Sequence, residues 1–165
     1  MDPREFRLAQ EVIATFAEQN SVFGLNTLMG RILGLLYISE EAQSLDDMAD
    51  KLDMSKGPIS QVCRRLKDNN LIEKVWVPGD RKDYYKPVNN LFGRLFANQN
   101  DRMEQNIRTA ERLFQKANKQ IDHQADYIAD RMHEMKEFYT KLDVHNKKFV
   151  SEWKKQYRDL TTKTE

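Results

Sequence analysis

Residues 55–69 combine hydrogen-bonding side chains with a helical apolar stripe. At 100° per residue, Gln61 and Arg64 fall on the side of a helix opposite to the stripe. These are side-chain types that can pair with adenine and with guanine in the major groove of DNA. The apolar residues, which should face the core, are Ile59, Val62, Cys63 and Leu66. The candidate DNA contacts on this helix are Ser55, Lys56, Gly57, Pro58, Ser60, Gln61, Arg64 and Arg65.

The leading end of this helix is slim, because Gly57 and Pro58 carry little side chain. The backbone and the helix N-terminus could therefore approach a phosphate closely. Gln and Arg are also common on ordinary solvent-exposed helix faces, so this helix by itself favours an exposed face without a binding role.

A second basic feature follows at residues 71–88. The stretches 71–77 and 83–88 are rich in β-forming residues, and Pro78-Gly79 between them suits the central positions of a type II turn. We expect a two-stranded ribbon whose loop presents Arg81 and Lys82. A cation on such a loop can enter a minor groove, where narrow A·T segments concentrate negative potential.

The elements before the ribbon have the spacing of a helix-turn-helix. Ser44 and Asp47 form the pattern of a capping box that begins a helix over residues 45–53. Only Met54 and Ser55 separate this helix from the next, and Asn69-Asn70 ends the second helix because Asn tolerates the left-handed conformation. A helix-turn-helix followed by a basic hairpin predicts a winged helix.

The stretch SLDDMADKLDMSKGPISQVCRRLKDNNLIEKVWVPGDRKDYY, residues 44–85, resembles the DNA-binding core of the MarR superfamily of bacterial transcriptional regulators. More narrowly, GRILGLLYIS before it and VWVPGDRKDYY within it resemble the GbsR-type branch. The resemblance implies a homodimeric repressor or activator. It also implies that the wing arginine of the family corresponds to Arg81. The recognition-helix positions of the family correspond to Lys56, Gly57, Pro58, Ser60, Gln61 and Arg64.

The remaining sequence predicts helices that would build a dimer. Residues 1–26 should form an N-terminal helix that joins the dimer interface, and 27–88 the DNA-binding domain, opened by an apolar helix over 27–39. Residues 89–165 repeat apolar positions at helical spacing without a proline, and are expected to be a dimerisation region. Breaks are expected there at Asp122-His123 and over residues 143–146. The predicted fold class is mostly α: a winged helix-turn-helix with a two-stranded β-wing and a long helical C-terminal region.

The charge is unevenly distributed, although the net charge of the 165 residues is only +1. Residues 1–53 hold four Lys and Arg against ten Asp and Glu, whereas residues 54–88 hold eight against four. Local basicity in the second segment suits a polyanionic partner. The longest apolar stretch, residues 32–38, is too short to span a membrane, and the N-terminus has no signal-peptide pattern. A single cysteine excludes an internal disulfide framework, which fits a reducing compartment. We therefore expect a cytoplasmic protein.

Other residue patterns suggest no catalysis, cofactor or metal. The three histidines, His123, His133 and His145, lack ligand spacing and fit solvated helices, and no catalytic motif points to an enzyme. Cys63 is expected to be a packing residue.

Five aromatic residues could line a pocket for a small-molecule effector, since the GbsR-type resemblance implies choline-like cations, which bind aromatic faces. They are Phe16, Phe23, Tyr37, Phe92 and Phe96. Core packing is the stronger explanation for aromatic residues at helical spacing. The alternative function is a winged helix that docks a protein partner through its C-terminal helices.

Overall fold

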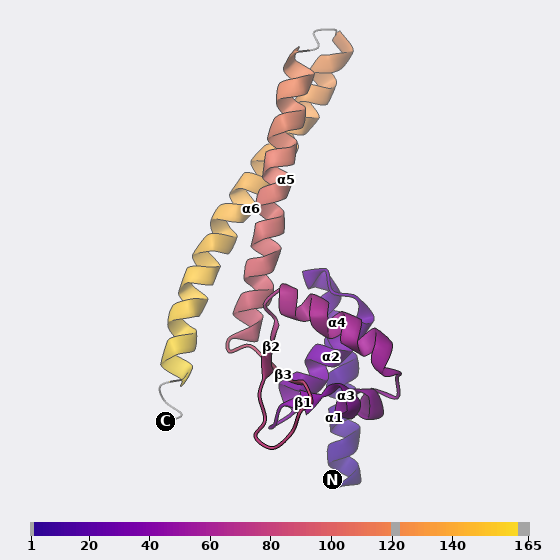
Figure 1. Ribbon diagram of the computed structural model, residues 1–165. Coiled ribbons are helices and arrows are strands. Elements are labelled where there is room, and N and C mark those ends of the chain that lie inside the picture. The colour runs from indigo at the N-terminus through magenta and orange to yellow at the C-terminus, as the bar shows by residue number, and fades with distance from the viewer. Residues whose placement is uncertain (1, 120–122, 162–165) are drawn as a thin grey trace. The chain divides into compact units, whose positions relative to one another are not determined.

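The computed structural model describes residues 2–119 and 123–161, which are mostly helical (Figure 1). Contacts along the chain divide it into two units, Met1–Leu95 and Phe96–Glu165, here called the N-terminal and C-terminal units. Among the described residues, no helix has the length and apolarity needed to cross a bilayer. The predicted division into 1–26, 27–88 and 89–165 concerns DNA binding and dimerisation, and it stays a prediction.

The N-terminal unit is built around helix α2, Thr27–Ile38, which packs against α1, Pro3–Gln19. A short 3-10 helix, η1 (Asn20–Phe23), joins the two. The Asn26 side chain accepts a 2.9 Å hydrogen bond from the Met29 amide and so fixes the start of α2. Most of α2 is buried, as its apolar sequence predicts. Tyr37, near the end of α2, is 48% exposed and so lies outside this buried part.

Two glycines bring α1 and α2 unusually close. A Cβ on Gly30 would lie 2.6 Å from the Ala17 Cα, and one on Gly34 would lie 3.1 Å from the Ile13 Cα. These contacts are with backbone atoms that cannot rotate away. The packing of α1 on α2 therefore depends on the absence of side chains at positions 30 and 34.

The predicted helix-turn-helix is confirmed as α3, Leu45–Leu52, and α4, Lys56–Asp68. The Ser44 hydroxyl accepts a 3.2 Å bond from the Asp47 amide, while the Asp47 carboxylate accepts a 2.8 Å bond from the Ser44 amide. This is the expected capping box. Asp53 closes α3 in the left-handed conformation, at φ 51°. The apolar stripe of α4 packs into the same core as α2 and α3.

The ribbon consists of β2, Ile72–Val75, and β3, Tyr84–Pro87, paired antiparallel with Val75 opposite Tyr84. The expected turn is present, because the Asp80 amide donates to the Val77 carbonyl at 3.3 Å and Gly79 has φ 85°. The prediction of two strands was incomplete. A third strand, β1 (Gln43–Ser44), pairs with the other edge of β3, giving the order β1-β3-β2. Two residues are too few to show the period-two pattern of a strand.

The C-terminal unit is an antiparallel pair of helices. Helix α5, Leu91–Lys119, begins in the N-terminal unit, and α6 is His123–Thr161. The ring centroids of Phe96 and Phe149 lie 4.9 Å apart, and those of Phe114 and His133 lie 5.5 Å apart. These two pairs define the antiparallel register of α5 and α6.

The two breaks predicted in this region have different outcomes. Asp122, in the first break, lies outside the described residues. The second break, over residues 143–146, was wrong because α6 continues through it. Lys147 lies 2.8 Å from Asp143, one turn earlier in α6, and 2.8 Å from Glu104 of α5, so the second ion pair joins this part of α6 to α5. Without proline or glycine at these positions, nothing in the backbone forces the helix to stop.

Candidate nucleic-acid interface

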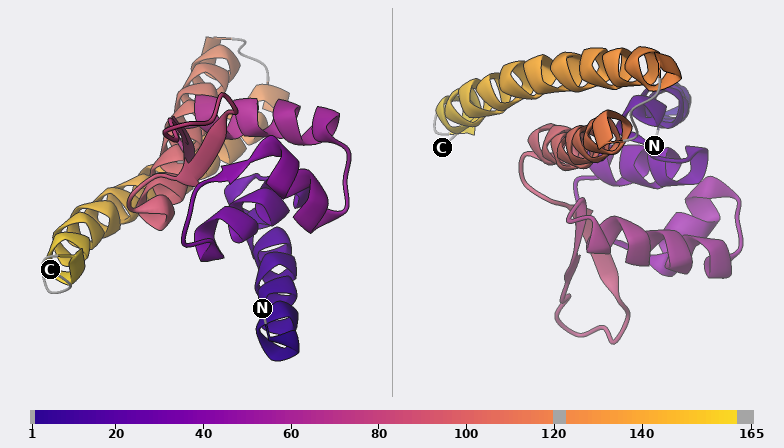
Figure 2. Two further views of the ribbon diagram at one scale, coloured as in Figure 1. Left: turned by 60° about the horizontal axis from the view of Figure 1, so that its bottom comes forward. Right: turned by 90° about the horizontal axis from the view of Figure 1, so that it is seen from above.

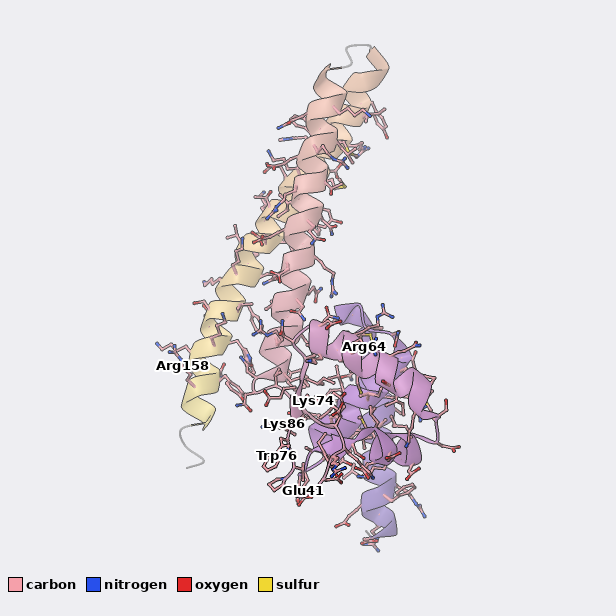
Figure 3. The ribbon with its side chains drawn as sticks, viewed as in Figure 1. Glu41, Arg64, Lys74, Trp76, Lys86 and Arg158 are labelled. Carbon is pink, nitrogen blue, oxygen red and sulfur yellow. The ribbon has the colours of Figure 1, made fainter. Side chains whose placement is uncertain are left out.

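Helix α4 has one buried apolar face and one exposed polar face. Cys63 and Leu66 are fully buried, whereas Gln61, Arg64 and Arg65 are exposed on the opposite side. Figure 3 labels Arg64 on this helix. Ser60, which was grouped with the outward residues, is half-buried. The helical periodicity read from the sequence therefore places most of the candidate DNA contacts on one solvent-facing surface.

The leading end of α4 is open. A Cβ on Gly57 would meet no atom within 4 Å, and Ser55, Lys56 and Pro58 are all exposed. Ser55 occupies the position before the helix, but its hydroxyl makes no capping hydrogen bond with the first turn. An anion could therefore approach the amides of this turn, where the helix dipole also favours negative charge.

The wing loop is ordered by Asp80, which sequence reasoning did not single out. Its carboxylate accepts a 3.0 Å bond from the Lys82 amide and a 2.9 Å bond from the Tyr84 hydroxyl. The hydrogen bond from the Lys82 amide is the main cause that lowers the pKa of Asp80. Asp80 thus behaves as a fixed anion that shapes the loop, and it leaves the neighbouring Arg81 side chain exposed.

The ribbon carries further charge along its strands. Lys74 lies 2.6 Å from Asp83, and Lys86 lies 3.2 Å from Glu73. Figure 3 labels Lys74, Lys86 and the exposed Trp76 on this part of the chain. Figure 2 (right) shows the hairpin projecting away from the helices of the N-terminal unit. The wing and the polar face of α4 therefore belong to a single folded unit.

Two lysines among the predicted DNA-contacting residues form ion pairs with an acidic residue of α3. The Asp46 carboxylate forms an ion pair with Lys56, and its second oxygen lies 3.4 Å from the Lys82 ammonium. Sequence reasoning missed this residue, since it precedes Lys82 by 36 positions and belongs to no recognisable motif. Lys82 is consequently directed toward α3.

The structure brings together three of the five candidate effector aromatics. The ring centroid of Phe16 lies 5.3 Å from that of Tyr37 and 5.9 Å from that of Phe92, and the centroids of Tyr37 and Phe92 are 5.4 Å apart. Phe23 instead packs against the core, and Phe96 belongs to the C-terminal unit, where Phe149 covers it. The remaining cluster is partly open, with Phe92 40% exposed.

Cys63 packs in the core, whereas His133 and His145 lie at the surface. Cys63 is fully buried, and burial raises the pKa of its thiol to about 12, so it stays protonated at neutral pH. His133 is exposed and lies against Phe114. In the part of the chain that the structure describes, no three His, Cys, Asp or Glu residues gather as a metal site would require.

Several Bacillus subtilis (strain 168) regulators are similar to about half of the chain. The HTH-type transcriptional repressor OpcR is 37% identical over 76 residues, which cover 46% of this chain and 41% of OpcR. The HTH-type transcriptional repressor GbsR is 32% identical over 88 residues, which cover 49% of this chain and 48% of GbsR. About half of the chain is thus similar to HTH-type transcriptional regulators, GbsR among them.

The similarity to these relatives is limited in extent. The chain spans about half the length of the curated relatives that it matches, and no protein-family model matches it. A solved transcriptional regulator superposes over 89% of this chain and 98% of its own, with a TM-score of 0.72 and 22% identity. That likeness confirms the fold, including the long C-terminal helices.

Proposed function

We propose that this protein is a sequence-specific, DNA-binding transcription regulator that acts as a homodimer in the cytoplasm. Helix α4 would enter the major groove and the wing would reach the adjacent minor groove. One observation carries the proposal: the exposed polar face of α4, with Gln61 and Arg64, belongs to the same folded unit as the exposed Arg81 of the wing. The names of the similar regulators agree with it.

Electrostatics supports a polyanion as the partner. The segment 54–88 holds twice as many basic as acidic residues, while residues 1–53 are strongly acidic. Phosphate contacts supply most of the sequence-independent affinity of DNA-binding proteins, whereas side chains at base edges supply specificity. In this protein Lys56, Arg65, Arg81 and Lys82 would meet phosphates or the minor groove, and Gln61 and Arg64 would read bases.

The surface of the C-terminal unit supports a homodimer. Tyr127, Phe138 and Phe149 recur at intervals of 11 residues, which places them along one side of α6, and they are 65%, 62% and 49% exposed. A two-helix hairpin has no further element of its own to cover such a stripe. Packing against a second copy under two-fold symmetry would bury it and would present two copies of α4 to half-sites about 34 Å apart.

A different class of function would use the same exposed stripe. In that alternative, the winged helix is a protein-interaction module and α6 docks an unrelated partner. The polar face of α4 and the open Gly57 end favour DNA, because a module that docks through α6 would leave that face without a role.

The role of an effector also stays a proposal. The cluster of Phe16, Tyr37 and Phe92 is the candidate site for a small cation, and packing of α1, α2 and α5 is its other role.

Salt dependence of binding to duplex DNA tests the proposal. Fluorescence anisotropy with a labelled duplex should give a logarithm of the association constant that falls linearly with the logarithm of salt concentration. The slope should be about −0.9 for each phosphate contacted. Failure to bind duplex DNA even at low salt would refute the proposal and favour the docking module.

A further inference from the structure

Asp46 joins two elements that are distant in sequence. It lies near the start of α3, with a side chain 33% exposed, and each of its two carboxylate oxygens takes a different lysine. Lys56 is the first residue of α4, and Lys82 belongs to the wing loop. The two ammonium groups therefore converge on one anion located between the leading end of α4 and the wing.

This arrangement distinguishes the two lysines from the arginines of the same surface. Among the described residues, Arg64, Arg65 and Arg81 form no ion pair with a carboxylate, whereas both lysines are paired with Asp46. The ion pair with Lys56 lowers the pKa of Asp46, so the carboxylate stays charged at neutral pH. The pairing is consequently present under the conditions in which the protein would meet DNA.

We infer that Lys56 and Lys82 form a clamp for one DNA backbone phosphate, and that Asp46 occupies this clamp in the free protein. The inference rests on the proposed DNA-binding function. A backbone strand separates the major groove, where α4 would lie, from the minor groove beside it, where the wing would lie. A phosphate of that strand would pass between the two elements. Two lysines that already converge on one carboxylate are placed to bind it.

Occupation of the clamp by Asp46 lowers the affinity of the protein for DNA. A phosphate must displace the carboxylate from both lysines, and the displaced carboxylate then lies close to the negatively charged backbone. It would recruit about one cation from solution, which offsets about one of the counterions that DNA releases on binding. Asp46 therefore makes binding both weaker and less dependent on salt than the basic side chains alone would make it.

The variant Asp46→Asn tests this inference, with Asp50→Asn as the matched control. Asp50 is one helical turn farther along α3, is exposed and forms no ion pair among the described residues, so both variants change the net charge equally. Duplex affinity at low salt should be about 3- to 10-fold higher for Asp46→Asn than for Asp50→Asn, since each exposed ion pair contributes modestly. The slope of the logarithm of the association constant against the logarithm of salt concentration should be more negative by about one.

The double variant Asp46→Asn/Lys82→Ala adds a readout specific to the clamp. It should lose most of the gain in affinity and return the slope toward that of the wild type. A slope for Asp46→Asn equal to that of Asp50→Asn would overturn the inference. Weaker DNA binding by Asp46→Asn, with an unchanged melting temperature, would also overturn it, because the carboxylate would then assist binding. If the wild type itself fails to bind duplex DNA at low salt, the proposed function fails instead.

Discussion

Replacement of Gly57 by alanine should raise stability and lower DNA affinity at the same time. Gly57 is the second residue of α4, and an added Cβ would meet nothing within 4 Å. Alanine restricts the unfolded chain more than glycine does and has a higher helix propensity, so Gly57→Ala should stabilise the protein by about 0.5–1 kcal/mol. The gain should lie near the lower figure, because the residue is in the first turn.

The effect on DNA binding has the opposite sign. The new methyl group would stand at the leading end of α4, where the proposal places a backbone phosphate against the first-turn amides. Moving that phosphate outward by about 1 Å would weaken hydrogen bonds to a charged group, which contribute about 1.5–3 kcal/mol each. The loss of one such bond corresponds to roughly 10- to 100-fold weaker binding.

Urea denaturation and fluorescence anisotropy measure the two effects separately. Gly30→Ala is the contrasting variant, since its Cβ would lie 2.6 Å from the Ala17 Cα and 2.9 Å from the Phe16 carbonyl oxygen. It should destabilise the protein by about 1–3 kcal/mol or more through overpacking. A Gly57→Ala protein that is more stable and binds DNA as well as the wild type would refute the close approach of this helix end to the backbone.

Four further predictions follow from the same structure. Gln61→Ala or Arg64→Ala should relax base preference at one operator position and cost about 1–3 kcal/mol on the specific site only; equal losses on random DNA would make the residue a phosphate contact. Arg81→Ala should weaken DNA binding in anisotropy with little change in melting temperature, because an exposed loop cation adds little to folding; the reverse pattern would make it structural. Sedimentation of the intact protein should show a dimer at micromolar concentration, and a well-behaved monomer would contradict the proposed burial of the α6 stripe between two copies. The raised pKa of Cys63, about 12 against an ordinary value of 9.0, should contribute stability that is complete below pH 9 and lost as pH rises toward 12. Alkaline denaturation should therefore be shallower for Cys63→Ala, and an identical pH profile would show that the thiol is not the cause.

Local features of the fold were predictable from the sequence because neighbouring residues determine them. The capping box of Ser44 and Asp47 involves residues three apart, and the Pro78-Gly79 turn needs only the positive φ that glycine supplies. Asn70 adopts φ 54°, as expected after a helix end. Periodicity likewise identified the buried stripe of α4. Such signals do not depend on the rest of the chain.

Features that depend on tertiary packing were not predictable in this way. The close contact of Gly30 with α1 involves residues 13 positions apart, and a helical glycine in isolation indicates only a weak helix position. Tyr37 follows the apolar pattern of α2 but lies where the core ends, so it is half-exposed. The helix continues across residues 143–146, where Lys147 forms an ion pair with Glu104 of a different helix. In each case the deciding atoms belong to a distant part of the sequence.

The same difference between local and tertiary features applies to the residues of the candidate interface. Its outward residues on α4 followed from helical geometry, and the exposed Arg81 followed from the turn. The pairing of Lys56 and Lys82 through Asp46 did not, since long flexible side chains reach partners that no spacing rule indicates. A basic residue in the sequence is thus a candidate contact, but its ion pairs in the free protein determine how readily a phosphate can use it.

Selection of binding sites from random duplex DNA tests the central claim most directly. The full-length protein should enrich a sequence made of two inverted half-sites, with their centres about one helical turn apart, because a two-fold dimer presents two copies of α4. Gln61→Ala should lose the preference at one matched position in each half-site. Recovery of unrelated sequences with no enriched element, from a protein that still binds DNA in low salt, would contradict sequence-specific recognition by α4.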